Sequence, residues 1–185
     1  MSGIPERQII GSGTLLDTSR LRHGLSDHYD IAQKNIHAYV FGEHGDSSFV
    51  PWSIANISGV GLDEFAQTIE KIGRGVAPLD RDALEHYVHT SGGQIIKRKN
   101  ATFYAVSVAV TKLLNVLFSA NESVVTVSTM MHGEYDIDDV CLSVLSIVGR
   151  EGAHGKILTP LTDDEVAKLQ HSANCLKDII KNIVI

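Results

Sequence analysis

Two apolar stretches, Val124–Met130 (VVTVSTM) and Val140–Val148 (VCLSVLSIV), decide the fold class of this chain of 185 residues. Both are rich in valine and other β-branched residues, which favour strands. An acidic turn over Gly133–Asp136 (GEYD) separates them, and a further turn is expected over Gly149–Gly155. Because the segments before and after them have helical patterns, the sequence predicts one mixed α+β domain over residues 1–185.

Helices are predicted on both sides of the strand region. Asp80 and the pair Thr162–Glu165 are helix caps, the second of the capping-box type. Gly92-Gly93 weakens the middle of the helix that Asp80 begins. The apolar segment Tyr104–Ala120 is interrupted by polar residues, so it indicates a buried helix and not a membrane span. The expected elements are helices over residues 14–25, 80–99, 102–120 and 162–183, a strand over 37–41 and a loop-rich stretch over 51–78.

Composition excludes several classes of protein. A net charge of −6 disfavours nucleic acid as a partner, because binding to phosphates needs a basic face. Cys141 and Cys175 are far apart, lie in apolar contexts and lack metal-ligand spacing, which indicates reduced core residues in a cytoplasmic protein. The N-terminus, Met1–Gln8, is polar and does not have the pattern of a signal peptide. We therefore expect no nucleic-acid partner and no membrane association.

Gly11-Ser12-Gly13 lies between the apolar pair Ile9-Ile10 and a predicted helix. That is the context of a loop that binds dinucleotide phosphates. Such a loop needs a further glycine or alanine three residues later, so that helix and strand pack closely. Leu16 occupies this position, and the phosphate-loop interpretation is rejected.

The stretch FGEHGDSSF, Phe41–Phe49, sets His44 between glycines. Asp17 and Arg20 lie three residues apart on the first predicted helix, so their side chains leave from one face. They form either an exposed surface ion pair or a pair with a role in binding and catalysis. In the second interpretation the Arg20 fork binds a carboxylate, and Asp17 orients a histidine as a general acid or base. His44 is the candidate for that histidine.

Three segments carry a specific family pattern, in this order: GSGTLLDTSRLR (11–22), HAYVFGEHGDSSFVPWS (37–53) and KNATFYAVSVAV (99–110). They resemble the NAD-dependent L-2-hydroxyacid dehydrogenases, and among them the L-lactate dehydrogenases most closely. The resemblance runs from Ile10 to the terminal helix. It implies a C-terminal, substrate-binding domain of antiparallel strands packed with long helices. It also implies the interconversion of pyruvate and L-lactate by hydride transfer with NAD(H).

The resemblance assigns roles to the three residues singled out above. His44 is expected to give and take the proton at the substrate carbonyl or hydroxyl oxygen. Asp17 is expected to orient His44, and Arg20 to bind the carboxylate of pyruvate or lactate. Protonation by His44 would remove the negative charge that develops on oxygen as hydride adds to carbon.

Further positions match residues that bind substrate, cofactor or effector in the family. Thr102 is expected to line the substrate pocket, Val106 to lie near the nicotinamide, and Ser12 to contact its carboxamide. Arg22 and His37 match the pair that binds fructose 1,6-bisphosphate across a subunit interface in allosteric bacterial lactate dehydrogenases. The resemblance therefore implies a homo-oligomer, tetrameric at full length, with that bisphosphate as a possible effector.

The departure from the family concerns the N-terminal half. Family members begin with a Rossmann domain of about 140–150 residues, which this sequence does not contain. We therefore expect the chain to be inactive alone. A malate or branched 2-hydroxyacid dehydrogenase and a non-catalytic oligomerisation domain remain as alternatives. A metal site at His37, His44 and Asp46 is disfavoured, because no standard ligand spacing supports it.

Overall fold

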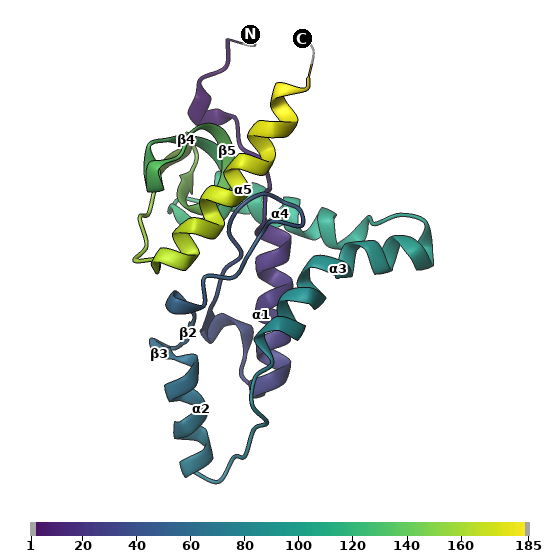
Figure 1. Cartoon of the computed structure of the whole chain (residues 1–185), viewed down its shortest axis with the longest axis vertical. Helices are drawn as coiled ribbons and strands as arrows, with labels where there is room; N and C mark the ends of the chain where they lie inside the picture. Colours follow the sequence, from purple (N-terminus) through teal and green to yellow (C-terminus); the bar gives the residue numbers. More distant parts are fainter. Residues whose placement is uncertain (1–2, 184–185) are drawn as a thin grey trace.

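A computed structural model describes residues 3–183, so Met1 and Ser2 of the polar N-terminal stretch lie outside it. Two helices leave the body as a projecting arm (Figure 1). In chain order the elements are η1 (Glu6–Gln8), α1 (Leu15–Tyr29), η2 (Gln33–Asn35), β1 (Ile36–His37), η3 (Trp52–Ile54), β2 (Asn56–Ile57), β3 (Val60–Gly61), α2 (Leu62–Lys71), α3 (Arg81–Lys99), α4 (Tyr104–Phe118), β4 (Ser123–His132), η4 (Glu134–Asp136), β5 (Asp138–Gly149), β6 (Gly152–Lys156) and α5 (Asp163–Lys181).

The larger sheet is antiparallel, with β5 between β4 and β6 and Val127 opposite Val144. This confirms the two predicted strands and the α+β class. The turn expected over residues 149–155 is wrong in extent, because β5 reaches Gly149 and β6 begins at Gly152. Gly152 has φ +110°, and a Cβ there would lie 2.0 Å from the carbonyl oxygen of Arg7. A tight hairpin that packs against the backbone of η1 therefore replaces the predicted loop.

A smaller antiparallel sheet, β1-β2-β3, precedes α2. The strand predicted over residues 37–41 is wrong in extent, since β1 ends at His37 and Phe41 pairs with Phe49 in an isolated bridge. The stretch predicted as loop, residues 51–78, contains α2. The glycines before α2 led to the prediction of a loop. In the structure Gly59 lies in the β2–β3 turn with φ +86°, and Gly61 is the N-cap of the helix.

Most predicted helix ends lie within two residues of the ends in the structure. Ala83 N donates to the Asp80 side chain at the start of α3, and the Thr162–Glu165 capping box begins α5. α1 continues to Tyr29, four residues beyond its predicted end, until Asp30 adopts φ 52°. α3 runs unbroken through Gly92-Gly93, although each glycine inside a helix costs about 1 kcal/mol relative to alanine.

The core has three parts, and helix α1 contributes to two of them. Leu21 and Leu25 of α1 pack with residues of the small sheet and of α2 and α3. The α5 helix packs on the large sheet together with Phe41 and Phe49, chiefly through Leu169 and Ala173. Leu15 of α1 and Leu113 of α4 pack on Val127 and Val148. Leu15 thus holds α1 against the same large sheet on which Phe41 and Phe49 pack.

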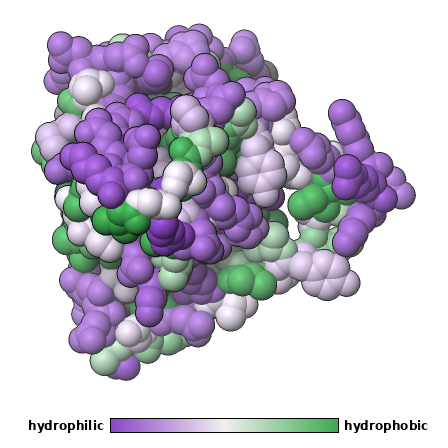
Figure 2. All heavy atoms as spheres, turned by 90° about the horizontal axis from the view of Figure 1, so that it is seen from below, coloured by the Kyte–Doolittle hydropathy of each residue, from purple (hydrophilic) through white to green (hydrophobic). Residues whose placement is uncertain are grey.

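The prediction that the apolar segment starting at Tyr104 is a buried helix is wrong. Only Ala109 and Leu113 of α4 are buried. The helix also carries apolar side chains away from the face that touches the body, since it returns from the arm that α3 extends (Figure 1). Hydrophobic and hydrophilic residues are mixed on this arm, which stands off the rest of the surface (Figure 2). The exposed apolar side chains on or beside α4 are Phe103, Tyr104, Val106, Val108, Val110, Leu114 and Phe118.

Both cysteines were expected in the core, and this is wrong. Cys141 is exposed and Cys175 is half-buried, and both are free thiols. On β5 the neighbours Val140 and Leu142 point inward, so the strand alternation turns Cys141 outward. In α5 the apolar stripe is buried at Leu169 and Ala173, but Ile180 and Ile183 near its end are exposed. None of the helices within residues 3–183 is long and apolar enough to cross a bilayer.

Candidate active site

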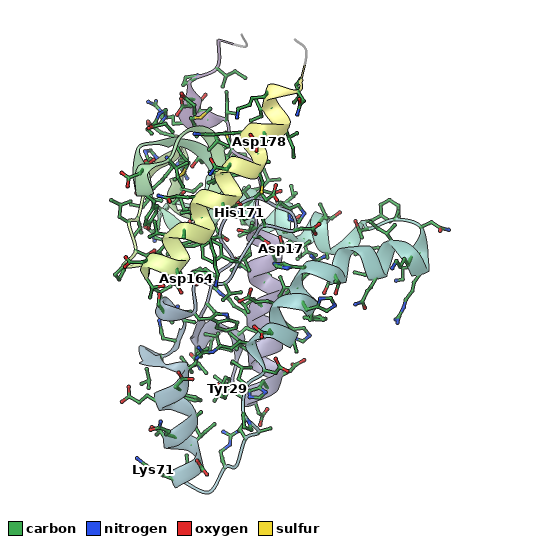
Figure 3. The ribbon with its side chains drawn as sticks, in the orientation of Figure 1. Asp17, Tyr29, Lys71, Asp164, His171 and Asp178 are labelled. Carbon is green, nitrogen blue, oxygen red and sulfur yellow. The ribbon has the colours of Figure 1, made fainter. Side chains whose placement is uncertain are left out.

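The structure brings Asp17, Arg20 and His44 together where α1 meets the α3–α4 arm; Asp17 is labelled in Figure 3. The Asp17 carboxylate divides its oxygens, with Oδ2 2.6 Å from His44 Nδ1 and Oδ1 accepting from Arg20 Nη1 at 2.9 Å. The side chains of Asp17 and Arg20 are 7% and 14% exposed. The alternative of an exposed surface ion pair is therefore wrong.

The base of the His44 loop is closed by backbone pairing. Phe41 and Phe49 exchange hydrogen bonds of 2.9 and 3.1 Å, and Gly42 exchanges two with Ser143 of β5. Gly42 has φ +98°, and a Cβ there would lie 2.7 Å from the Ser172 hydroxyl oxygen of α5. Glycine is required here because the loop passes directly between the sheet and α5.

The tip of the loop is braced by its own polar side chains. The Glu43 carboxylate accepts from the backbone N–H and the hydroxyl of Ser47, and the Ser48 hydroxyl donates to the Gly45 carbonyl. These bonds engage Glu43 inside the loop and leave His44, 62% exposed, and the exposed Asp46 at the tip. The loop therefore uses the Glu43 carboxylate for internal bonding and leaves the His44 ring exposed.

Gly11 and Gly13 allow the backbone of residues 11–13 to pass close to the large sheet. Gly11 forms a bridge with Ser128 of β4. Gly13 has φ +48°, and a Cβ there would lie 2.2 Å from the Ser143 hydroxyl oxygen. Ser12 itself is exposed and is not among the residues that line the cavity around His44.

A cavity of about 260 Å³ adjoins the Asp17–His44 pair, close to the lower end of the roughly 300–1,000 Å³ typical of small-molecule sites. Five of the predicted site residues line it, namely Asp17, Arg20, His44, Thr102 and Val106. The helix expected near Thr102 begins two residues later, so Thr102 lies in the connection between α3 and α4. The predicted substrate residues thus share one cavity although 85 residues separate the first from Thr102.

One wall of this cavity was missed by the sequence reasoning. It comes from α3, through His89, Gly92, Gly93 and Ile96. The steps of three and four residues between them place them on one helix face. That spacing was available as a signal, but the glycines were interpreted only as a weakness of the helix.

Arg22 and His37 lie away from the cavity. Arg22 Nε donates to the Ala38 carbonyl at 3.0 Å, and its guanidinium lies 4.9 Å from the centre of the Tyr39 ring. His37 is exposed on β1. Burial lowers the pKa of Lys112, and the nearby Arg22 charge lowers it further. Positive side chains therefore accumulate on this side of α1.

The Asp17 hydrogen bond raises the pKa of His44 above its ordinary value, and the negative charges of Asp17 and Glu43 act in the same direction. Partial burial and the Arg20 charge oppose the shift. Because Nδ1 faces Asp17, the second ring nitrogen, Nε2, is the one available to exchange a proton with a bound molecule. The pair can therefore act as a tuned general acid and base.

We expect Asp17→Asn to lower the pKa of His44 in the 185-residue chain, because the amide keeps the shape but removes the stabilising charge. Because the pKa of His44 is higher in the folded than in the unfolded chain, its protonation stabilises the fold at pH values below the ordinary histidine pKa. That contribution disappears as the pH rises through the folded pKa, so Asp17→Asn should also weaken the pH dependence of unfolding in this window. Histidine ring resonances followed by NMR against pH measure the shift in the pKa of His44.

The matched control is Asp27→Asn, which removes an exposed partner of His23. An equal shift of the His44 pKa in both variants would show that Asp17 does not act on His44.

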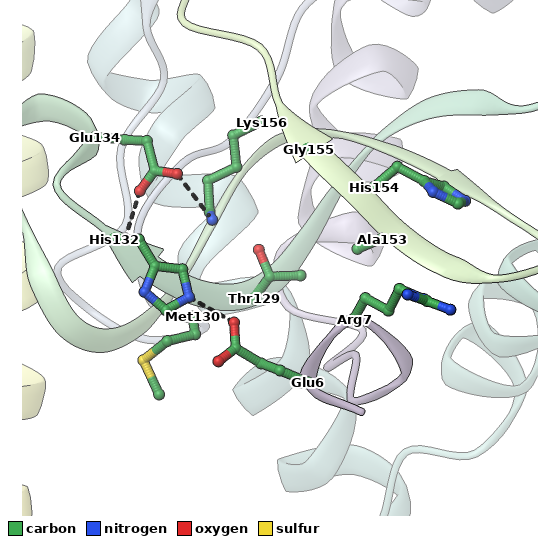
Figure 4. A pocket seen from close by; sticks show the side chains of 10 residues that line it. All are labelled: Glu6, Arg7, Thr129, Met130, His132, Glu134, Ala153, His154, Gly155 and Lys156. Carbon is green, nitrogen blue, oxygen red and sulfur yellow. Dashed lines mark hydrogen bonds and ion pairs between the residues drawn. The ribbon is translucent and has the colours of Figure 1, made fainter. Parts of the chain in front are cut away.

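A second cavity, of about 250 Å³, lies at the edge of the large sheet beside η1 (Figure 4). Two ion pairs lie within it, with His132 Nε2 2.6 Å from the Glu6 carboxylate and Lys156 Nζ 3.1 Å from Glu134. Arg7 and His154 also line it and pair with Glu151 and Glu122, which lie outside the lining. The buried Thr129 hydroxyl has no hydrogen-bond partner among the described residues. Since the Glu6–His132 pair ties η1 to the sheet and the Lys156–Glu134 pair ties β6 to η4, we assign the cavity a structural role. Within residues 3–183 no cluster of three histidine, cysteine or acidic residues is placed to hold a metal ion.

Comparison with known proteins gives consistent matches. Residues 14–184 match the model of the lactate/malate dehydrogenase alpha/beta C-terminal domain. The chain is 39% identical over 183 residues to an L-lactate dehydrogenase of Acetivibrio thermocellus, covering 99% of this chain and 57% of the relative. It is 42% identical over 183 residues to the enzyme of Thermoanaerobacterium saccharolyticum, covering 99% and 58%.

Solved structures agree with these matches. The L-lactate dehydrogenase from Clostridium thermocellum superposes with a TM-score of 0.88 at 34% identity, over 100% of this chain and 59% of that one. The minor L-lactate dehydrogenase from Enterococcus mundtii gives 0.88 at 30% identity, over 100% and 57%. The chain thus spans less than two thirds of the length of the relatives it matches.

Proposed function

The chain belongs to the lactate/malate dehydrogenase family, and we propose that it forms the substrate-binding half of an NAD-dependent L-lactate dehydrogenase. The observation that carries this proposal is the geometry of one carboxylate. Asp17 holds His44 through one oxygen and Arg20 through the other, and all three line one cavity. An acid–base histidine beside a carboxylate-binding fork is what a 2-oxo acid requires.

In this proposal Arg20 binds the substrate carboxylate with its planar fork and so sets the orientation of the neighbouring carbonyl. His44 holds a proton on Nε2 and delivers it to the carbonyl oxygen during reduction, and takes it back during oxidation. Asp17 stabilises the resulting imidazolium and keeps Nδ1 turned away from substrate. Thr102 closes the cavity beside the substrate.

The cofactor fits this site in part. Val106 offers an apolar side chain, 44% exposed, on the cavity wall, which suits the face of a nicotinamide ring. Ser12 lies outside the cavity lining, and its contact with the carboxamide stays a prediction. Bound NADH would supply the hydride, which is chemistry that the cofactor carries.

We expect the 185-residue chain alone to show no steady-state reduction of pyruvate by NADH, because its sequence offers no glycine-rich loop for the dinucleotide phosphates. Activity should appear in a joined enzyme, defined as this chain placed after the Rossmann domain of a family member. Oxidation of NADH followed by absorbance measures both proteins. Turnover by the 185-residue chain that disappears in His44→Ala would refute the expected inactivity, and a folded but inactive joined enzyme would refute the proposed function.

We also propose a cytoplasmic homo-oligomer that responds to fructose 1,6-bisphosphate. The exposed apolar side chains of α4 support association with further protein surface. The positive charges of Arg22 and Lys112, with His37 exposed nearby, support binding of a phosphorylated anion. In the proposed oligomer these side chains face each other across a subunit interface, and without an anion their like charges repel. A bisphosphate that bridges them would favour the assembled, active state.

For the joined enzyme we expect the bisphosphate to lower the half-saturating pyruvate concentration by about 5- to 150-fold, the usual range of allosteric coupling. The double variant Arg22→Gln, His37→Gln should lose this response. Pyruvate saturation curves with and without the effector measure it, and the exposed Arg74→Gln serves as a control for loss of a positive charge. If the double variant responds as fully as the parent, these two residues are structural only.

A further inference from the structure

His171 and Cys175 lie one helical turn apart on α5, where His171 is exposed and is labelled in Figure 3. Residues four apart on a helix are neighbours on its surface. Here the imidazole Nε2 of His171 is 3.6 Å from the sulfur of Cys175, which is a free, half-buried thiol. The two cysteines of the chain are far apart, but this histidine gives Cys175 a neighbour of the kind that binds metal ions together with sulfur.

The separation of the two donor atoms is close to the one that a tetrahedral zinc ion requires. Zinc binds thiolate sulfur at about 2.3 Å and imidazole nitrogen at about 2.0–2.1 Å. At the tetrahedral angle these bond lengths place sulfur and nitrogen roughly 3.5 Å apart, compared with 3.6 Å in the structure. One ion can therefore bind both atoms without movement of the backbone and with only small rotations of the two side chains.

The helical turn that carries the two donors is held in place from its other side. Leu169 and Ala173 pack in the core against the large sheet. The buried Ser172 hydroxyl accepts from the backbone N–H of Glu43. Because this turn is already fixed by packing, its backbone has little conformational entropy left to lose when both donors bind the same ion.

Ion pairs flank the two donors along α5. Lys168, one turn earlier, lies 2.7 Å from Asp164, and Asp178, one turn later, lies 2.9 Å from Lys181. Lys177 lies two residues after the sulfur donor and leaves from a different side of the helix. The lysine charges on this face are therefore balanced by acids, and a cation can approach the donors without facing an unpaired positive charge.

We propose that His171 and Cys175 form a binding site for a zinc-like divalent cation on the surface of α5. Imidazole nitrogen and thiolate sulfur are donors that suit zinc, whereas magnesium and calcium take oxygen ligands. On binding, the Sγ–H bond of Cys175 is broken, a zinc–sulfur bond forms and the proton passes to the solvent.

Water fills the remaining positions around the ion. Within residues 3–183 no third histidine, cysteine or acidic side chain is placed to complete the site. The bound ion should therefore exchange with the solvent. Neither His171 nor Cys175 lines the cavity around His44, so the inference is independent of the proposed function.

Titration of the metal-free 185-residue chain with Zn²⁺, followed by calorimetry and by NMR of the histidine rings, tests the site. We expect the His171 resonances to shift as one ion binds. Cys175→Ser and His171→Gln should each weaken this binding by at least about 100-fold, because even residues outside the coordination shell contribute roughly 10–100-fold to metal affinity. Helical content measured by circular dichroism shows whether each variant has folded.

Two control variants should bind Zn²⁺ as the parent does. Cys141→Ser removes the other free thiol. His23→Gln removes a histidine that also has a partner four residues away on a helix, the Asp27 carboxylate at 3.5 Å. If either control loses the binding, or if His171→Gln or Cys175→Ser retains it, the ion is held elsewhere or by one donor alone, and the inference is wrong.

A second measurement uses the unaltered chain and does not depend on the folding of a variant. Alkylation of Cys175 by iodoacetamide, located by mass spectrometry, should slow in proportion to the fraction of sites that Zn²⁺ occupies. Mg²⁺ at the same concentration should have no effect, since it prefers oxygen ligands. Equal alkylation rates of Cys175 with and without Zn²⁺ would overturn the inference.

Discussion

Replacing His44 with asparagine is expected to lower kcat for pyruvate reduction by the joined enzyme by roughly 10²–10⁴-fold, the usual contribution of a general acid. Asparagine can accept or donate a hydrogen bond but cannot deliver a proton to the carbonyl oxygen. The charge that develops on oxygen would then have to be neutralised by water. Single-turnover rates measure the chemical step, and His86→Asn, on the exposed side of α3, is the matched control. A fall of less than tenfold would remove His44 from the acid–base role.

The pH dependence follows from the raised pKa of His44. Reduction needs the protonated ring, so its rate should fall as the pH rises through this pKa. Oxidation needs the neutral ring, so its rate should rise over the same window. The groups that face His44 from neighbouring elements are Asp17 and Arg20 of α1 and His89 of α3, with Glu43 and Asp46 in its own loop. Profiles that move together in the same direction would contradict the assignment.

Replacing Arg20 with lysine is expected to raise KM for pyruvate and lower kcat, with a combined loss in kcat/KM of at least about 10²-fold. Lysine keeps the charge but cannot make two parallel hydrogen bonds to a carboxylate. A lysine would also have to reach Asp17 and the substrate from one nitrogen, whereas Arg20 contacts Asp17 through Nη1 at 2.9 Å and has Nη2 on the side of Gly92. Steady-state kinetics measure both constants. Arg74→Lys, at an exposed site paired with Asp30, controls for the change of residue type.

The KM for pyruvate and the titration of His44 together show whether Arg20 binds the substrate carboxylate or only positions Asp17. If Arg20 only kept Asp17 in place, Arg20→Lys would change the titration of His44 and leave KM unchanged. If it binds the carboxylate, KM rises even where the titration of His44 is preserved. An unchanged KM would therefore remove Arg20 from the carboxylate site.

The parts of the fold that were predicted correctly are those with strong local signals. The capping box at Thr162 and the β-branched run of Val124–Met130 depend on neighbours a few residues away. α2 was missed because glycines on its N-terminal side belong to a turn. α4 was predicted as buried because its composition is apolar, whereas burial depends on which surface covers it.

For the site, the sequence determined which residue types are present and which of them share a helix face. Asp17 and Arg20 had to lie together because they are three residues apart on α1, and the motif around His44 indicated the family. Only the tertiary structure decided that His44 reaches Asp17 across 27 residues and that Gly92 lies beside Arg20. These contacts depend on close approaches of backbone to the sheet at Gly13 and to α5 at Gly42. Such approaches bring together segments far apart in the chain, and no local pattern of caps or periodicity contains them.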